Sequence, residues 1–325
     1  MPAQIAAASL KAGLLLLLLL LSGCQSPPQS RQLLAEPPAI SRQALLSTVP
    51  FYPQQDYFCG PTTLSEVAAY YGVEHSADSI ASLTFTPGLQ GSLQIEMAAA
   101  SRQLGFVAYE QRSSLSQLLQ LIDEKIPVIV LQNNGLSWLP QWHYAVVIGY
   151  DLDRREMILH SGLTAEYRLP LATFERTWQR ANYWLLAMLP PGRTSALLDP
   201  FLYTRACQDL LQTRQTEAGV AALISATEQW PDYWLPYFLL GNHFLALALA
   251  PAEAATWFAQ GLPLAKQQPA YLNNYALVLS ELGCKAQALE LIKAARQLAP
   301  DDANIIDSEQ QITAQATTAS CSVTH

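Results

Sequence analysis

The sequence carries little charge: 14% of its 325 residues are Asp, Glu, Lys or Arg, and the net charge is −8. Lys and Arg form no cluster, which argues against a nucleic-acid-binding surface. The five cysteines include no CxxC pair, so a structural zinc site is not expected. Gly-rich phosphate loops and metal-ligand patterns are also absent. We therefore expect no metal and no cofactor. Half of the residues are apolar, which excludes wholesale disorder and allows about two domains.

One long apolar run lies near the N-terminus, where eight leucines, 14–21, follow Lys11. It is too short for a confident membrane span but typical of a secretion signal. The Leu-Ser-Gly-Cys string that ends at Cys24 resembles the lipobox of bacterial lipoproteins. That resemblance implies a signal peptide over 1–23 and acylation of Cys24. By analogy with lipoprotein sorting, Gln25 at the next position favours the outer membrane, facing the periplasm. The alternative is an uncleaved anchor with an incidental cysteine.

Residues 24–46 hold two Pro-Pro pairs among polar residues. Such composition favours an extended, mobile spacer. The sequence therefore predicts a flexible tether over 24–46 and a folded domain that begins at residue 47.

The segment 47–192 changes its apolar period along its length. Helical spacing comes first and short β-branched runs follow, which predicts an α+β domain. The expected helices lie at 61–71, 92–105 and 115–122, and the expected strands at 127–131, 143–150, 157–160 and 183–189.

The segment 200–302 divides into three frames of similar length, 200–233, 234–268 and 269–302. The eighth positions are the small residues Cys207, Gly241 and Ala276, as close helix packing requires. The pattern resembles tetratricopeptide repeats, which implies an all-α domain that binds a protein partner on a concave surface. A generic helical bundle is the alternative. Residues 303–325 are expected to be a C-terminal tail.

The chemistry is expected around two residues, Cys59 and His143. Cys59 lies just before a helix that Pro61 opens, where free N–H groups and the helix dipole favour a thiolate and an oxyanion. His143 begins an apolar strand, a rigid platform for a general base. Together they form a Cys/His constellation for nucleophilic catalysis. The competing interpretation is structural: Cys59 could be a buried thiol or pair with Cys207, Cys284 or Cys321.

The two motifs, Gln-x₄-Cys-Gly-Pro and His-Tyr-x-Val-Val-x-Gly-Tyr, together resemble the bacteriocin-leader-processing (double-glycine) cysteine peptidases and their stand-alone relatives. The resemblance covers roughly 47–189. It implies a papain-like fold with Cys59 as nucleophile, His143 as base and Gln54 as oxyanion donor; Gln55 competes with Gln54. The leader-processing enzymes are fused to a membrane transporter, and no Walker motif is found here, so double-glycine specificity is not carried over.

The family expects an Asp or Asn that orients the histidine. If a hairpin turns near 152–154, the residues opposite His143 fall within 161–165, which contain no carboxylate. Ser161 best matches the family position. Asp151 lies too far along the strand, and Glu166 could reach only if the register slipped. The resemblance therefore implies a Cys/His dyad assisted by Ser161 or by a backbone carbonyl.

Two functions from different classes follow. The first is a membrane-anchored cysteine peptidase that hydrolyses peptide or protein substrates without a cofactor; acyl transfer to an amine would use the same residues. The second is a catalytically weak or inactive scaffold that binds peptides at the envelope together with the repeats. Trp138 and Trp142 could line a substrate groove or pack in a loop.

Overall fold

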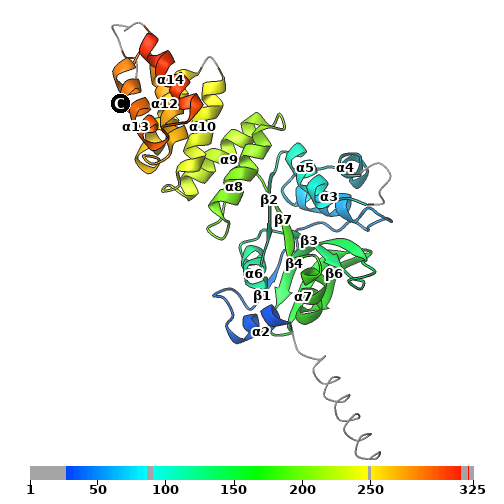
Figure 1. Cartoon of the computed structure of the whole chain (residues 1–325). Coiled ribbons are helices and arrows are strands. Elements are labelled where there is room, and N and C mark those ends of the chain that lie inside the picture. The colour runs from blue at the N-terminus through cyan, green and yellow to red at the C-terminus, as the bar shows by residue number, and fades with distance from the viewer. Residues whose placement is uncertain (1–26, 86–90, 248–249, 316–320, 322–325) are drawn as a thin grey trace, which may run out of the picture. The chain divides into compact units, whose positions relative to one another are not determined.

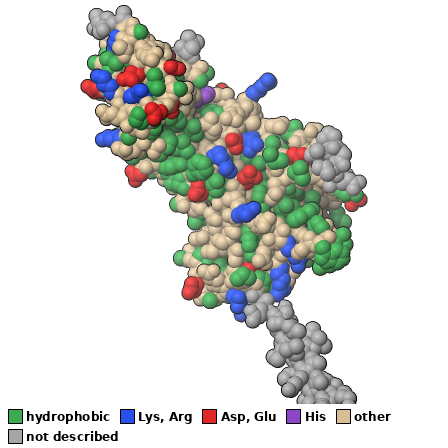
Figure 2. Space-filling view, in the orientation of Figure 1, with side chains coloured by type: hydrophobic (Ala, Val, Ile, Leu, Met, Phe, Trp, Pro, Cys, Tyr) green, Lys and Arg blue, Asp and Glu red, His purple; other side chains and the backbone are tan. Residues whose placement is uncertain are grey.

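A computed structural model describes residues 27–85, 91–247, 250–315 and 321. The expected signal peptide and Cys24 lie outside these residues. The chain divides into two compact units: Met1–Tyr70 with Arg112–Leu185, and Tyr71–Gln111 with Leu186–His325. Within the described ranges, no helix combines the length and apolar character that crossing a bilayer needs. Charged side chains of both signs are interspersed over the face shown in Figure 2.

The first unit is built on an antiparallel sheet (Figure 1). Its strands follow one another in the order β3 (Val128–Asn133), β4 (Trp142–Asp151), β5 (Glu156–Ser161) and β6 (Thr164–Pro170), and β1 (Gln43–Leu45) pairs with the far end of β4. β3 is buried along its whole length, and β4 is buried from Tyr144 onward. This burial accounts for the continuous apolar runs in their sequences.

Three helices cover this sheet. α3 (Cys59–Tyr70) and α6 (Leu115–Asp123) pack on β3 and β4, whereas α7 (Leu171–Gln179) packs on β3, β5 and β6. The antiparallel sheet with helices confirms the predicted α+β class. Strand β6 and helix α7 were not predicted from the sequence. The β6 residues are mostly exposed and polar, so they carry no apolar run.

The segment expected to be a flexible tether is folded from residue 27 onward. Helix α2 (Pro28–Ala35) packs against α6 and α7, and β1 adds to β4. The cause is the fully buried carboxylate of Glu175, which accepts hydrogen bonds from the backbone N–H groups of Gln29 (2.9 Å) and Ser30 (2.6 Å) and from the Ser30 hydroxyl (2.5 Å). A long-range polar contact thus outweighs the local Pro-rich composition.

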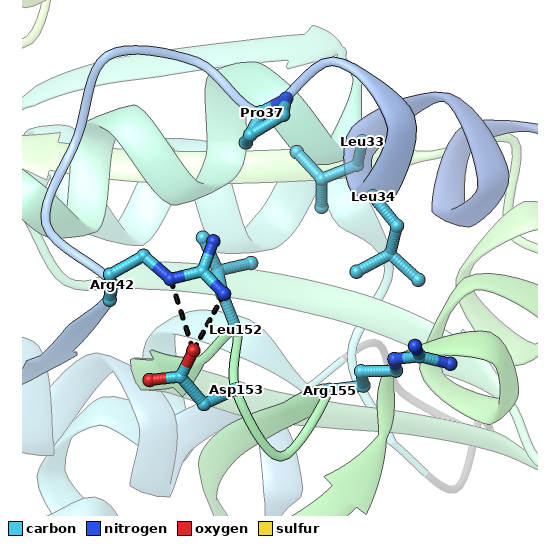
Figure 3. A pocket seen from close by; sticks show the side chains of 7 residues that line it. All are labelled: Leu33, Leu34, Pro37, Arg42, Leu152, Asp153 and Arg155. Atoms are coloured by element: carbon cyan, nitrogen blue, oxygen red, sulfur yellow. Dashed lines mark hydrogen bonds and ion pairs between the residues drawn. The ribbon is translucent and has the colours of Figure 1, made fainter.

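A cavity of about 190 Å³ lies between this segment and the turn that joins β4 to β5. Arg42 pairs with Asp153 at 2.6 Å on one side of it (Figure 3). The lining residues are Leu33, Leu34, Pro37, Arg42, Leu152, Asp153 and Arg155. They lie beyond the Asp151 end of β4, at the opposite end of the strand from His143.

The second unit begins with residues that the sequence assigns to the peptidase-like domain. It contains α4 (Ala77–Thr84), α5 (Gln94–Gln103) and β2 (Val107–Arg112), which neighbours β7 (Trp184–Leu189). Contacts between α5 and the first helix after residue 200 explain this assignment: Arg102 pairs with Asp209 at 3.7 Å, and Gln215 Nε2 donates to the Gln103 carbonyl at 3.0 Å. The expected boundary at 192–200 therefore differs from this division.

Residues 200–298 form three successive helix pairs, visible in Figure 1. The first helices begin at Pro200, Trp234 and Pro269, the starts of the three predicted frames. The pairs are α8 (Pro200–Leu211) with α9 (Thr216–Gln229), α10 (Trp234–Ala246) with α11 (Pro251–Gly261), and α12 (Pro269–Glu281) with α13 (Lys285–Leu298). The tetratricopeptide class of these helices stays a prediction.

The expected C-terminal tail is partly folded. Residues 303–314 form helix α14 (Ala303–Ala314), which packs on α12 and α13 with Ile305 and Ile312 buried. Cys321 forms a disulfide with Cys284. This pairing leaves Cys59 and Cys207 as free thiols, so the alternative of a disulfide at Cys59 is wrong.

At one of the predicted eighth positions, Gly241, a small residue is required by contact. A Cβ added at Gly241 would lie 2.7 Å from the ring of buried Phe258 in the partner helix. We expect Gly241→Ala to destabilise the helical region by about 1–3 kcal/mol because a packed ring must move. Thermal unfolding of this variant checks the prediction, with Ala259→Ser on the exposed side of α11 as the control. A melting temperature equal to wild type would contradict it.

The Glu175 contact predicts protease resistance of the N-terminal segment. Glu175→Ala leaves two backbone donors and one hydroxyl without an acceptor, at a cost of about 1–3 kcal/mol for each buried group. We expect trypsin to cleave after Arg31 and Arg42 roughly tenfold faster or more, as local opening becomes more frequent. Mass spectrometry of a digestion time course measures this rate. Glu36→Ala, which changes an exposed carboxylate, should cleave like wild type.

Candidate active site

Cys59 is the first residue of helix α3 and is half-buried. The first α-helical hydrogen bond runs from the Thr62 N–H to the Phe58 carbonyl at 2.9 Å. The helix thus begins two residues before the predicted start at Pro61. Proline is tolerated there because N–H groups of the first turn have no partner inside the helix. Residues 60–68 are all buried, so the nucleophile candidate stands on a fixed helix.

The environment of the Cys59 sulfur has two opposing effects. Burial raises the pKa of the Cys59 thiol, whereas backbone N–H groups of Tyr144, Gly60 and Cys59 itself donate to the sulfur and lower that pKa. Burial is the larger effect. The expectation that the helix N-terminus would give a low thiol pKa is therefore wrong. The Tyr144 contact also places the sulfur beside β4, at the residue that follows His143.

His143 is the second residue of β4 and is half-buried. Its Nε2 lies 2.9 Å from Ser161 Oγ at the end of β5. Burial lowers the pKa of the His143 imidazole, so the ring is neutral at neutral pH. The structure thus brings Ser161 to the histidine as the family position implied, with the other ring nitrogen left for a second partner.

Ser161 is followed by a two-residue turn, Gly162-Leu163, that leads into β6. Gly162 has φ +59° at the first central position, a left-handed conformation that glycine adopts without strain. This turn also contacts the loop before Cys59. The N–H of Gln54 donates to the Gly162 carbonyl at 3.0 Å, and the N–H of Gly162 donates to Gln54 Oε1 at 3.1 Å.

These two hydrogen bonds distinguish Gln54 from Gln55. With Oε1 held by Gly162, the Nε2 of Gln54 is the end of the amide left to donate, and it is buried without a hydrogen-bond partner. Gln55 is exposed, and its carbonyl accepts from the Phe58 N–H at 3.1 Å. A buried, unpaired donor is unusual in a folded protein and often marks a functional site.

Of the two carboxylates that the sequence offered as partners of His143, Asp151 is engaged elsewhere and Glu166 is exposed. Asp151 accepts hydrogen bonds from the N–H groups of Asp153 (3.0 Å) and Arg154 (2.9 Å) at the other end of β4. Glu166 is exposed, and its backbone N–H donates to Nδ1 of the buried His160 at 3.2 Å. The third position therefore carries a serine. No group of His, Cys, Asp and Glu suited to a metal ion occurs in the described ranges.

Gly162 and Glu66 were not predicted as site residues from the sequence. Gly162 stands in a Ser-Gly-Leu-Thr string between two extended segments, which is a detectable turn signal. Glu66 is a fully buried carboxyl on α3 whose Oε1 accepts from the Tyr52 N–H at 2.9 Å. Its only signal was a charged residue between the apolar residues Leu64 and Val67.

Large apolar side chains are exposed in the segments that flank His143 and Ser161 in the sequence. The loop before β4 presents Trp138 (78% exposed), β4 begins with Trp142 (54%), and the turn after Ser161 presents Leu163 (77%). Asn133 Oδ1 fixes the loop before β4 by accepting from the N–H groups of Gly135 and Gln141, both at 2.9 Å. Trp138 is therefore displayed by a hydrogen-bonded loop and Trp142 by the start of β4, and neither is packed in a core.

Comparison with protein families gives one match over the residues that carry this site. Residues 46–184, less than half of the chain, match the model of the Peptidase_C39 like family. The match supports a peptidase-type domain with a C39-like fold across this segment. Comparison with curated proteins gives no match.

The matches to two similar solved structures extend over almost all of those two chains. One is a C39-like peptidase from Bacillus anthracis, 17% identical over 47% of this chain and 99% of that chain, with a TM-score of 0.39. The other is the peptidase domain of Streptococcus ComA, a bifunctional ABC transporter involved in a quorum-sensing pathway. It is 24% identical over 44% of this chain and 98% of that chain, with a TM-score of 0.36.

The pKa shifts predict how thiol reactivity depends on pH. Burial raises the pKa of the Cys59 thiol and lowers that of the His143 imidazole, so the resting pair is neutral at neutral pH. We expect alkylation of Cys59 by iodoacetamide to accelerate from about pH 6 to about pH 9, because the thiolate is the nucleophile. Peptide mass spectrometry measures the rate at Cys59. A rate already maximal at about pH 6 would reveal a preformed thiolate–imidazolium pair and contradict the prediction.

Proposed function

We propose that the chain is a lipid-anchored cysteine peptidase of the bacterial cell envelope. The observation that carries the proposal is the unpaired Nε2 donor of Gln54, fixed by the same turn that brings Ser161 to His143. An amide donor, a thiol at a helix start and an oriented imidazole are the parts that acyl transfer through a thioester requires. The family match over 46–184 supports the same chemistry.

In the proposed reaction each residue has a separate role. His143 Nδ1 accepts the thiol proton while Cys59 Sγ attacks the peptide carbonyl carbon, and Nε2–H donates to Ser161. The Gln54 Nε2 and the N–H groups at the start of α3 hold the oxyanion. His143 then protonates the leaving amine as the C–N bond breaks. Water attacks the thioester, the C–S bond breaks, and the acid and the free thiol are released. No step needs a cofactor.

Exposed apolar side chains in the segments that flank His143 and Ser161 support binding of a substrate there. Trp138, Trp142 and Leu163 are exposed, and exposed apolar surface typically marks an interaction site. Water-excluding contacts there would also strengthen the hydrogen bonds to the oxyanion.

Two sequence features support the proposed location. The lipobox-like string implies acylation of Cys24, with Gln25 favouring the outer membrane. The disulfide between Cys284 and Cys321 is of the kind found in oxidising compartments such as the bacterial periplasm. The three helix pairs fit a tetratricopeptide-type array that binds a protein partner.

A thiol-reactive peptide probe tests the proposed mechanism on the full-length chain. We expect Cys59→Ala to abolish labelling and His143→Ala to slow it by roughly 10²-fold or more, because the base is lost. Ser161→Ala should slow labelling less, because orientation of the ring is weakened but the base remains. The rate of labelling is followed by gel fluorescence and mass spectrometry.

The matched control is Cys207→Ala. Cys207 is the other free cysteine among the residues that the structure describes, and it is fully buried, with burial raising its pKa. This variant should label like wild type. Equal labelling of wild type and Cys59→Ala would contradict the peptidase proposal. The alternative, an inactive peptide-binding scaffold, is favoured by the raised pKa of Cys59 and by a serine at the third position; Cys59→Ala would then keep every cellular phenotype.

A further inference from the structure

The buried carboxyl of Glu66 has no part in the mechanism described above. It lies on α3, seven positions after Cys59, and is 0% exposed. Burial is costly for a carboxyl group unless its oxygens find partners. Oε1 accepts from the Tyr52 N–H at 2.9 Å, and Oε2 is buried without a partner.

Tyr52 belongs to the irregular loop that leads to the nucleophile. Residues 50–55 form neither helix nor strand, so their backbone N–H groups depend on contacts outside regular structure. The loop is held at three points. His160 Nε2 lies 3.1 Å from the Val49 carbonyl, Glu66 holds Tyr52, and Gly162 holds Gln54. Glu66 belongs to α3, the helix that begins with Cys59. Its partner Tyr52 lies two residues before Gln54.

We propose that Glu66 is a positioning residue that links helix α3 to the loop of residues 50–55, which carries the oxyanion donor Gln54. Glu66 thereby sets the position of Gln54 Nε2 relative to the Cys59 sulfur. This inference rests on the proposed peptidase function. The path runs from α3 through Glu66 and Tyr52 to Gln54, and onward through Gly162 to the turn that carries Ser161. The nucleophile, the oxyanion donor and the support of the base are thereby joined by hydrogen bonds.

The state of the carboxyl indicates a suitable conservative variant. Burial raises the pKa of Glu66 to about 8, so the group is a neutral acid at neutral pH. Glutamine has the same shape, no charge and a carbonyl oxygen that can accept from Tyr52. Leucine is similar in size but accepts no hydrogen bond.

Two reagents separate an oxyanion defect from a general defect. Acylation of Cys59 by p-nitrophenyl acetate passes through a tetrahedral oxyanion: sulfur bonds to the acetyl carbon and p-nitrophenolate leaves. Alkylation by iodoacetamide displaces iodide and forms no oxyanion. We expect Glu66→Leu to slow acylation roughly tenfold or more while alkylation stays within about twofold of wild type. Glu66→Gln should leave both rates within about twofold.

A double variant tests whether the effect passes through Gln54. Gln54→Ala should slow acylation, and adding Glu66→Leu should slow it no further, because coupled residues are not additive. The full-length chain, purified in detergent, is used throughout, and thermal unfolding verifies folding. Glu66→Met replaces Glu66→Leu if the latter does not fold.

The outcomes distinguish the two proposals. Equal loss of acylation and alkylation in Glu66→Leu, or an effect that adds to that of Gln54→Ala, overturns the positioning role. A slow Gln54→Ala beside an unaffected Glu66→Leu overturns the role of Glu66 alone. If Gln54→Ala acylates like wild type, or if wild type alkylates at Cys59 but does not acylate, the proposed mechanism fails and the role of Glu66 fails with it.

Discussion

The candidate site depends on the paired hydrogen bonds between Gln54 and Gly162. They join an irregular loop to a two-residue turn, and each partner donates once and accepts once. The bond to Oε1 decides which end of the Gln54 amide remains available. Because Ser161 precedes Gly162 directly, the same turn also determines where the hydroxyl meets His143. A change in this turn would therefore affect the donor and the base together.

Much of this arrangement could be read from the sequence, and the reasons are local. Cys59 and His143 stand at the starts of strongly periodic segments, so a helix and a strand could be assigned to them. Ser161 followed from counting along a hairpin. The choice between Gln54 and Gln55 could not be made, because it depends on a contact with a glycine 108 residues away.

Two other failures share one cause: tertiary structure outweighed a local rule. Composition predicted a mobile segment before residue 47, yet Glu175 binds Ser30 across 145 positions and orders it. The helix start predicted a low thiol pKa at Cys59, yet burial has the greater influence. In the helical region, by contrast, the small residues predicted close helix packing, and the approach of Gly241 to Phe258 confirms it at that position. Helix α14 was also missed, although it carries apolar residues, among them the buried Ile305 and Ile312.

The folded N-terminal segment has a consequence for where the protein can work. If Cys24 is acylated as proposed, only Gln25 and Ser26 separate it from Pro27. The Cα atoms of Cys24 and Pro27 are then at most roughly 10 Å apart. Along β4, the eight steps from Asp151, at the cavity end where β1 pairs, to His143 span roughly 26 Å. A candidate site held in this way would stay at a nearly constant distance from the membrane. It would meet polypeptides that extend from the lipid surface to that distance, and it would rarely reach those that lie flat in the headgroups or diffuse far from the bilayer.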